Sequence, residues 1–279
     1  MTRTAVFLDV DGTLIDDYGH VPDSAVQAVR EARENGHLVF LCTGRSMTEL
    51  THEVLDVGYD GYVLASGAYV QVGDDVLRHE TLPPEALRHV ADWFDAHGGG
   101  YYFQAHHGVF SSPAARDLLR EVVAASIASD PAFDQEDHGL LSYVETIVVD
   151  ADPFAEPITK TIFFDAAAPF EEIRAEFADF EVVPSSVTVF GTSAGEMMLP
   201  GVHKATGIEI VLAHLGIDRA DTIAIGDSYN DLEMLQHVAV GIAMGDAPQP
   251  VKDIADEVTA STAEDGVRLA FVRHGLIAG

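Results

Sequence analysis

Two carboxylates one residue apart end an apolar run near the start of the chain. The segment FLDVDGTLID, residues 7–16, contains Asp9 and Asp11 and then Gly12. Asp-Gly is a common turn signal, so one interpretation is a strand that stops and turns. The other is a pair of carboxylates on one face, since alternate residues of a continuing strand project the same way. Carboxylates this close repel each other unless a cation or a shared proton relieves them, and a bound metal would do so.

Further polar side chains follow apolar segments elsewhere in the chain. The segments LVFLCTGR and TIAIGDSYND each read as a strand that ends in polar residues, and GVHKATG begins a predicted helix. Thr43 supplies a hydroxyl, Arg45 a guanidinium and Lys204 an ammonium. Asp227 and Asp231 supply carboxylates and Asn230 an amide, and Gly44 lies between Thr43 and Arg45. Ligands of open α/β sheets bind at the carboxyl ends of the strands, so these groups are expected to meet there.

Each of these residues also has an ordinary structural explanation. Thr43 suits the N-cap of a following helix. Asp227 suits an N-cap as well, and Asp231 suits a first-turn acid that the helix dipole favours. A single lysine such as Lys204 is usually solvated. The joint pattern at three predicted strand ends favours one shared site over four separate explanations.

The order of the motifs resembles that of the haloacid dehalogenase superfamily of phosphotransferases. Its four motifs correspond here to DVDGT, CTGR, Lys204 in GVHKATG, and GDSYND. The phrases EMMLPGVHKATGI and GDSYNDLEML, and an insert between the second and third motifs, are similar to the Cof-type (type IIB) phosphatases. The resemblance covers essentially the whole chain and is weakest in the insert.

The resemblance implies a catalytic and a metal-binding role for the carboxylates. Asp9 would be the nucleophile that forms an aspartyl-phosphate, and Asp11 would be the general acid and base. Mg²⁺ would be held by the carboxylates of Asp9 and Asp227 and by the backbone carbonyl of Asp11. Asp231 would orient Lys204 or stand behind the metal ligands rather than bind the ion directly.

The resemblance also implies which groups hold the phosphoryl oxygens. They are the amides of Val10 and Gly44 and the side chains of Thr43, Lys204 and Asn230. Arg45 would contact the substrate or would anchor its loop by a salt bridge.

The pattern of apolar runs predicts an α/β fold with a parallel sheet, split by an insert. Residues 1–82 and 199–279 alternate short strands with helices, as in the Rossmann-like core of the resembling family. Residues 83–198 pair strands with helices and predict an inserted α+β domain, which the resemblance identifies as a cap that selects the substrate. Within these regions, residues 47–58 predict a helix, residues 69–80 a hairpin around Gly73, and residues 130–141 an acidic loop.

Composition limits the possible partners. The 279 residues carry a formal net charge of −31, with 15 lysines and arginines against 46 acids. That balance argues against binding to nucleic acid or to an anionic membrane, and any phosphate site must supply its own positive charge or a metal. The single cysteine, Cys42, excludes an intrachain disulfide framework and a Cys-rich zinc site. With no signal peptide or membrane-length apolar run, we expect a cytoplasmic monomer or homodimer.

These observations predict a Mg²⁺-dependent phosphatase for small phosphorylated metabolites, with sugar phosphates as the first choice. A phosphatase for a phosphorylated cofactor, FMN or pyridoxal phosphate, is the alternative within the same class, and a phosphomutase is chemically close. A regulator that binds a phosphometabolite without turning it over is the alternative from another class. The intact motif residues count against that regulator.

Overall fold

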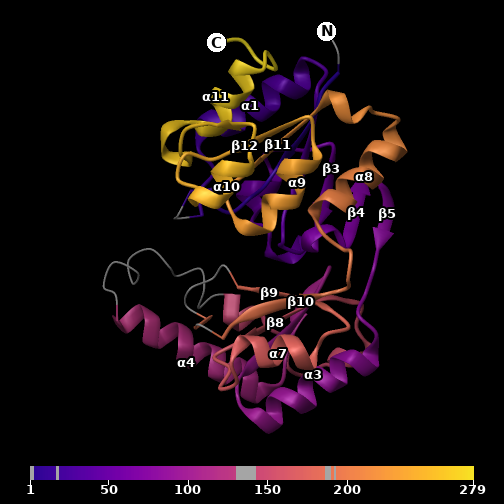
Figure 1. The fold of residues 1–279 in the computed structure, drawn as a ribbon, viewed down its shortest axis with the longest axis vertical. Helices are drawn as coiled ribbons and strands as arrows, with labels where there is room; N and C mark the ends of the chain where they lie inside the picture. The colour runs from indigo at the N-terminus through magenta and orange to yellow at the C-terminus, as the bar shows by residue number, and fades with distance from the viewer. Residues whose placement is uncertain (1–2, 17–18, 130–142, 186–189, 192) are drawn as a thin grey trace. The chain divides into compact units, whose positions relative to one another are not determined.

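The structure is a computed structural model that describes residues 3–16, 19–129, 143–185, 190–191 and 193–279 (Figure 1). The acidic loop expected at 130–141 lies outside these residues. The chain divides into two compact units, one formed by residues 1–79 and 202–279 and the other by residues 80–201. Within the described ranges, no helix combines the length and apolarity needed to cross a bilayer.

The first unit is built on an eight-stranded sheet with the order β13-β12-β11-β1-β2-β3-β4-β5. The strands from β13 to β3 pair in parallel, whereas β4 and β5 form the antiparallel hairpin that the sequence predicts around Gly73. The strands are β1 (Ala5–Leu8), β2 (Leu38–Cys42), β3 (Gly61–Leu64), β4 (Tyr69–Val72), β5 (Asp75–His79), β11 (Thr222–Gly226), β12 (Val240–Ala243) and β13 (Glu257–Val258).

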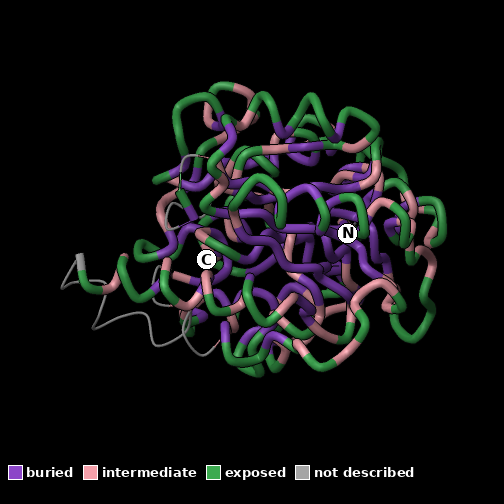
Figure 2. Tube along the Cα trace, turned by 90° about the horizontal axis from the view of Figure 1, so that it is seen from below, coloured by how far each residue is buried: buried purple, intermediate pink, exposed green. Residues whose placement is uncertain are grey.

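Helices cover both faces of this sheet, which explains why its central strands are apolar throughout. In β1, Val6 and Leu8 face a core that includes residues of α1 and α11, while Ala5 and Phe7 face a core with α8, α9 and α10. Figure 2 shows buried positions concentrated in the interior and exposed ones along the outer loops. The helices are α1 (Asp23–Glu34), α8 (Lys204–Leu215), α9 (Leu232–His237), α10 (Gln249–Ile254) and α11 (Gly266–Arg273).

The prediction of one continuous helix over residues 47–58 is wrong. A 3₁₀ turn, η1 (Met47–Glu49), is followed by Leu50 in an extended conformation and by the four-residue helix α2 (His52–Leu55). Two competing caps explain the break, because Ser46 and Thr51 each begin a separate turn. The Thr51 hydroxyl accepts from the amide of Val54, 3.3 Å away, and so starts a new helix where the apolar pattern alone suggested continuation.

The second unit is an antiparallel sheet with the order β7-β6-β8-β10-β9. Residues of α3 and α7 share one apolar cluster with the sheet, and residues of α4 share another. This agrees with the α+β arrangement expected of the insert. The elements are α3 (Pro84–His97), β6 (Gly100–Ala105), β7 (Gly108–Phe110), α4 (Pro113–Ser129), β8 (Ile158–Phe164), α7 (Phe170–Glu176), β9 (Glu181–Pro184) and β10 (Gly195–Met198).

Candidate active site

Asp9 follows the carboxyl end of β1 directly and is buried, with 3% of its surface exposed. The strand does not continue through Asp11, so the two carboxylates are not related by strand alternation. Instead the chain turns after Asp9, and the Val10 carbonyl accepts from the amides of Leu14 and Ile15 at 2.9 Å. This turn is the structure that Asp-Gly signals, and it leaves each carboxylate with different partners.

Lys204 lies at the centre of the acidic cluster. It is the first residue of α8 and is completely buried, unlike the solvated surface lysine that was the ordinary alternative. Its Nζ donates to Asp9 Oδ1 at 2.6 Å and to Asp231 Oδ1 at 2.5 Å. It also donates to Asn230 Oδ1 at 3.1 Å, so one ammonium uses three acceptors from two segments of the chain.

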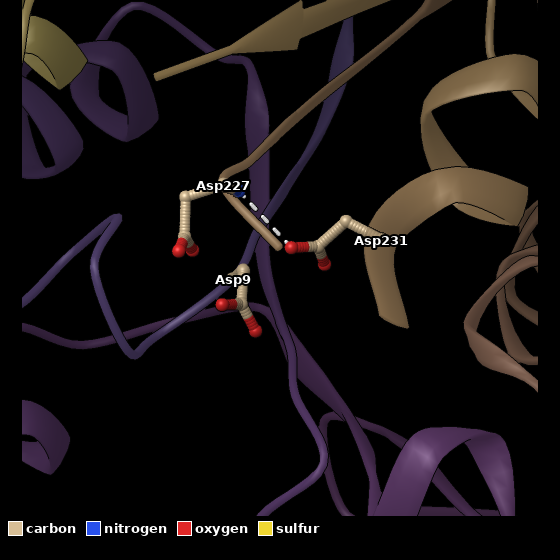
Figure 3. A group of neighbouring side chains, drawn as sticks. All are labelled: Asp9, Asp227 and Asp231. Atoms are coloured by element: carbon tan, nitrogen blue, oxygen red, sulfur yellow. Dashed lines mark hydrogen bonds between the residues drawn. The ribbon is translucent and has the colours of Figure 1, made fainter. Parts of the chain in front are cut away.

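Asp231 caps a turn and holds the lysine at the same time. Its Oδ2 accepts from the amides of Asp227 and Ser228, both at 3.0 Å, and Figure 3 shows the bond to Asp227. The helix-start interpretation of Asp231 is therefore correct, although Ser228 rather than Asp227 is the N-cap residue of η6 (Tyr229–Asp231). Because protein donors occupy both oxygens, the contacts support the role of orienting Lys204.

Asp9, Asp227 and Asp231 lie close together, and one carboxylate oxygen of each lies within 4.8 Å of the other two (Figure 3). The Thr13 hydroxyl donates to Asp227 Oδ1 at 3.1 Å and fixes that carboxylate. Among the described residues, no donor reaches Asp9 Oδ2. The cluster thus contains two carboxylate oxygens, Asp9 Oδ2 and Asp227 Oδ2, that accept from no described residue, and the threonine orients the second carboxylate through its other oxygen.

Burial makes this cluster electrostatically unfavourable without a further cation. Burial, followed by the charge of Asp231, raises the pKa of Asp9 well above its ordinary value, although Lys204 opposes the shift. The same two causes raise the pKa of Asp227 to about 7. Burial alone would lower the pKa of Lys204, but Asp231 and Asp9 raise it well above the ordinary value. One ammonium among three carboxylates leaves negative charge that a divalent cation would neutralise.

The donor set suits a hard divalent cation. All candidate ligands are oxygen atoms, and the carboxylates of Asp9 and Asp227 each accept a hydrogen bond from another side chain, as ligands of Mg²⁺ commonly do. The backbone carbonyl of Asp11 belongs to the same turn as Asp9. These residues therefore fit Mg²⁺. Its charge would offset the repulsion between the crowded carboxylates.

Asp11 contacts Arg45 rather than the acidic cluster. Arg45 Nε donates to Asp11 Oδ2 at 2.9 Å and Nη2 to Oδ1 at 2.5 Å, a two-bond pairing of guanidinium and carboxylate. Arg45 Nη1 also donates to the carbonyl of Glu49 at 2.9 Å. Of the two expectations for Arg45, the contacts match the salt bridge, and the Asp11 side chain keeps 56% exposure.

Thr43 and Asn230 hold donors that no described residue uses. The buried hydroxyl of Thr43 accepts from the amide of Arg45 at 3.2 Å, and its own proton has no acceptor in that part of the chain. Thr43 is not a helix cap, because Ser46 has that position in η1. Asn230 is exposed and accepts through Oδ1 from Lys204 and Ser228, which leaves its amide protons available. Gly44 follows Thr43 in the same loop.

Sequence reasoning missed three hydroxyl groups at this site. Thr13 lies in the motif DVDGT and Ser228 in GDSYND. Their positions beside the candidate carboxylates could therefore have identified them. Thr262 was not detectable in this way, because it lies far along the chain from every motif. It enters the site through a hydrogen bond to the backbone of Gly12.

Replacing Gly12 with alanine is expected to lower both stability and turnover. Gly12 has φ +71°, and a Cβ there would lie 2.6 Å from Asp227 Oδ2. The left-handed conformation alone costs about 1–2 kcal/mol for a residue with a side chain. Gly36→Ala is the matched control, since Gly36 has φ +90° with open space around it. Urea unfolding should show a lower free energy of unfolding for both variants, whereas kcat should fall only in Gly12→Ala. Equal kcat values for the two variants would contradict the idea that a side chain at position 12 displaces the Asp227 carboxylate.

Comparisons with known proteins agree with this geometry. A model of the haloacid dehalogenase-like hydrolases matches residues 6–271. YkrA of Bacillus subtilis is 28% identical, over 99% of this chain and 100% of its own length. The 5-amino-6-(5-phospho-D-ribitylamino)uracil phosphatase YitU of the same organism is 25% identical, over 94% of each chain. The solved structure of BT4131, a subclass IIB sugar phosphatase, has a TM-score of 0.77 and 25% identity, with 98% of this chain and 100% of that one covered.

The family match spans nearly the whole chain, and the parallel sheet with its strand-end cluster is the arrangement the resemblance implied. The predicted fold class and the predicted class of enzyme are therefore confirmed: the chain belongs to the haloacid dehalogenase-like hydrolases and is a phosphatase of that family.

Proposed function

We propose that the protein is a Mg²⁺-dependent phosphatase that hydrolyses small phosphate monoesters through an aspartyl-phosphate on Asp9. The observation that carries this proposal is the state of the Asp9 carboxylate. Lys204 holds Oδ1 at 2.6 Å, whereas Oδ2 has no donor among the described residues. A nucleophile must be held in a fixed orientation while its attacking atom stays free of hydrogen-bond donors. Asp9 has this arrangement among the described residues.

In the proposed first step, Asp9 Oδ2 attacks the phosphorus and the bond from phosphorus to the leaving oxygen breaks. Asp11 donates a proton to that oxygen, which departs as an alcohol. In the second step a water attacks the phosphorus of the acyl phosphate, Asp11 accepts the proton of this water, and the bond to Asp9 breaks. The products are inorganic phosphate and the regenerated carboxylate, so no further reactant is required.

The remaining donors would stabilise the negative charge of the transferred group. The Thr43 hydroxyl, the Asn230 amide and the Lys204 ammonium are proposed to contact phosphoryl oxygens, together with the amides of Val10 and Gly44. In this structure Arg45 occupies both oxygens of Asp11, so Asp11 would have to leave this pairing to donate its proton to the leaving oxygen. Mg²⁺, when bound by Asp9, Asp227 and the carbonyl of Asp11, would supply positive charge to the carboxylates and to the phosphate.

Sugar phosphates are the proposed substrates, and a phosphorylated cofactor such as FMN or pyridoxal phosphate is the second candidate. The similarity to the sugar phosphatase BT4131 supports the first. The similarity to YitU, whose substrate carries a phosphorylated ribityl chain, supports the second. Both relatives act on phosphate esters of polyhydroxylated carbon chains, so this shared chemistry is what we propose for the present chain.

The proposal assigns roles to the two parts of the chain. Residues 1–82 and 199–279 would carry catalysis, and residues 83–198 would select the leaving group as a cap. We also propose that the protein is a cytoplasmic monomer or homodimer. It would act on free metabolites and bind neither nucleic acid nor a membrane.

Removal of divalent metal is expected to abolish activity reversibly. The purified protein should release p-nitrophenol from p-nitrophenyl phosphate in Mg²⁺, lose at least about 99% of this rate in excess EDTA, and regain it when Mg²⁺ is restored, because the uncompensated carboxylates repel a phosphate dianion. Activity that is indifferent to EDTA would refute the metal-dependent mechanism. Absence of release under every metal condition would instead favour a phosphometabolite-binding regulator.

A screen of phosphorylated metabolites would then separate the substrate candidates. Higher kcat/KM for hexose or pentose phosphates than for FMN and pyridoxal phosphate would support the first candidate. The reverse order would support the second.

A further inference from the structure

A threonine near the C-terminus hydrogen-bonds the backbone of the turn that follows Asp9. Thr262, in the 3₁₀ turn η7 (Thr262–Glu264), is 7% exposed. Its Oγ1 lies 3.0 Å from the carbonyl oxygen of Gly12 and 3.4 Å from that of Thr13. A hydroxyl has a single proton, so the shorter contact to Gly12 is the main bond and the Thr13 contact is secondary. The bond joins residues 250 positions apart.

The two residues that Thr262 contacts both lie against the carboxylate of Asp227. The Thr13 hydroxyl donates to Asp227 Oδ1 at 3.1 Å, and the Gly12 backbone approaches so closely that a Cβ would lie 2.6 Å from Oδ2. A shift of this turn would therefore rotate or displace the Asp227 carboxylate. The same turn also contains Asp11, so one backbone segment positions two of the proposed functional groups.

The segment that carries Thr262 is itself firmly held. Thr259 Oγ1 donates to the carbonyl of Gly266 at 2.8 Å, and the amide of Gly245 donates to Ala260 at 3.0 Å. Glycines at 245 and 266 allow this segment to pack directly against neighbouring backbone, since a Cβ at either would lie under 3.0 Å from Ala260. A side chain on such a fixed support can restrain the turn that follows Asp9 more effectively than one on a mobile loop.

We propose that Thr262 is a positioning residue for the catalytic turn, which acts through Gly12 and Thr13 on Asp11 and Asp227. The proposal rests on the proposed phosphatase function. Thr262 does not touch the substrate; its hydroxyl fixes the turn, and the turn fixes the carboxylates. Loss of the hydroxyl should therefore slow the chemical step and weaken metal binding more than it changes substrate affinity.

Thr262→Val tests this inference, because valine keeps nearly the same shape and removes the donor. We expect kcat to fall about tenfold while KM changes less than about twofold, since small misplacements of reacting groups are costly. Calorimetry should show Mg²⁺ binding about threefold weaker, less than the loss typical of a direct partner of a ligand. Thr262→Ser, which keeps the hydroxyl, should restore kcat to within about threefold of wild type.

Thr259→Val is the matched control. It removes an equally buried hydroxyl from the same segment, but the lost bond goes to Gly266 rather than to the catalytic turn. Both valine variants should lower the melting temperature, and only Thr262→Val should lower kcat and Mg²⁺ affinity. Equal kcat in the two folded valine variants, or no rescue by serine, would overturn the inference. Failure of the phosphatase proposal itself would be visible separately, as absence of activity in the wild-type protein.

Discussion

Asp9→Asn is expected to lower kcat by at least about four orders of magnitude, a loss similar to that caused by removing the nucleophile of other covalent hydrolases. The amide oxygen is a poor nucleophile, and the variant cannot form the acyl phosphate. The protein should nevertheless stay folded. Asp9 is buried and its pKa is raised by that burial, so a neutral side chain of the same shape removes an unfavourable charge while it can still accept from Lys204. We expect an unchanged or higher melting temperature.

The measurement is steady-state hydrolysis of p-nitrophenyl phosphate, together with thermal unfolding of the same preparation. Asp74→Asn changes the net charge equally at an exposed position of the β4–β5 hairpin and should leave both quantities unchanged. Normal turnover by correctly folded Asp9→Asn would refute the nucleophile assignment. Trapping of an acid-stable, hydroxylamine-sensitive phosphoprotein in wild type alone would support it.

Lys204→Met is expected to remove most activity and, unlike Asp9→Asn, to destabilise the protein. The ammonium bonds Asp9, Asp231 and Asn230 at 2.5–3.1 Å. Removal of one partner from a buried ion pair typically costs about 3–5 kcal/mol, because the other charge remains without compensation. The value of kcat should fall by about three orders of magnitude, since a positive charge that stabilises the negative phosphoryl transition state is lost.

Urea unfolding with and without Mg²⁺ separates the two effects. The divalent ion should stabilise Lys204→Met more than it stabilises the wild-type protein, because more uncompensated carboxylate charge is then available to it. Lys252→Met is the control, as it removes the same charge from the last turn of α10. If Lys204→Met unfolds at the same urea concentration as Lys252→Met, the buried ammonium does not hold the cluster together.

The sequence allowed the central part of the site to be predicted because chemistry and topology agreed there. Asp9 and Asp227 follow parallel strands, and parallel strands bring their carboxyl ends to one edge of a sheet. Once β1 and β11 are recognised as neighbours, proximity of these carboxylates follows. Lys204 was placed correctly at a helix start, but its complete burial depends on three acceptors that no local pattern around it reveals.

Other features depend on contacts between distant segments. The bond from Thr262 to Gly12 has no sequence signature, because serine and threonine are common in loops for many reasons. Residues 47–58 keep an apolar pattern that suits a helix, and only the competing caps at Ser46 and Thr51 divide it. The pairing of Arg45 with Asp11 was one of two alternatives that side-chain type alone did not separate.

The interrupted layout of the first unit sets an order for folding during synthesis. Strand β1 pairs with β2, which follows within 40 residues, and with β11, which begins at Thr222. One edge of β1 therefore stays uncovered on the ribosome until more than 200 residues have been made, while the intervening residues 80–201 already contain a complete sheet. Exposed strand edges promote aggregation, so the unit of residues 80–201 is suited to fold first and the unit of residues 1–79 and 202–279 last.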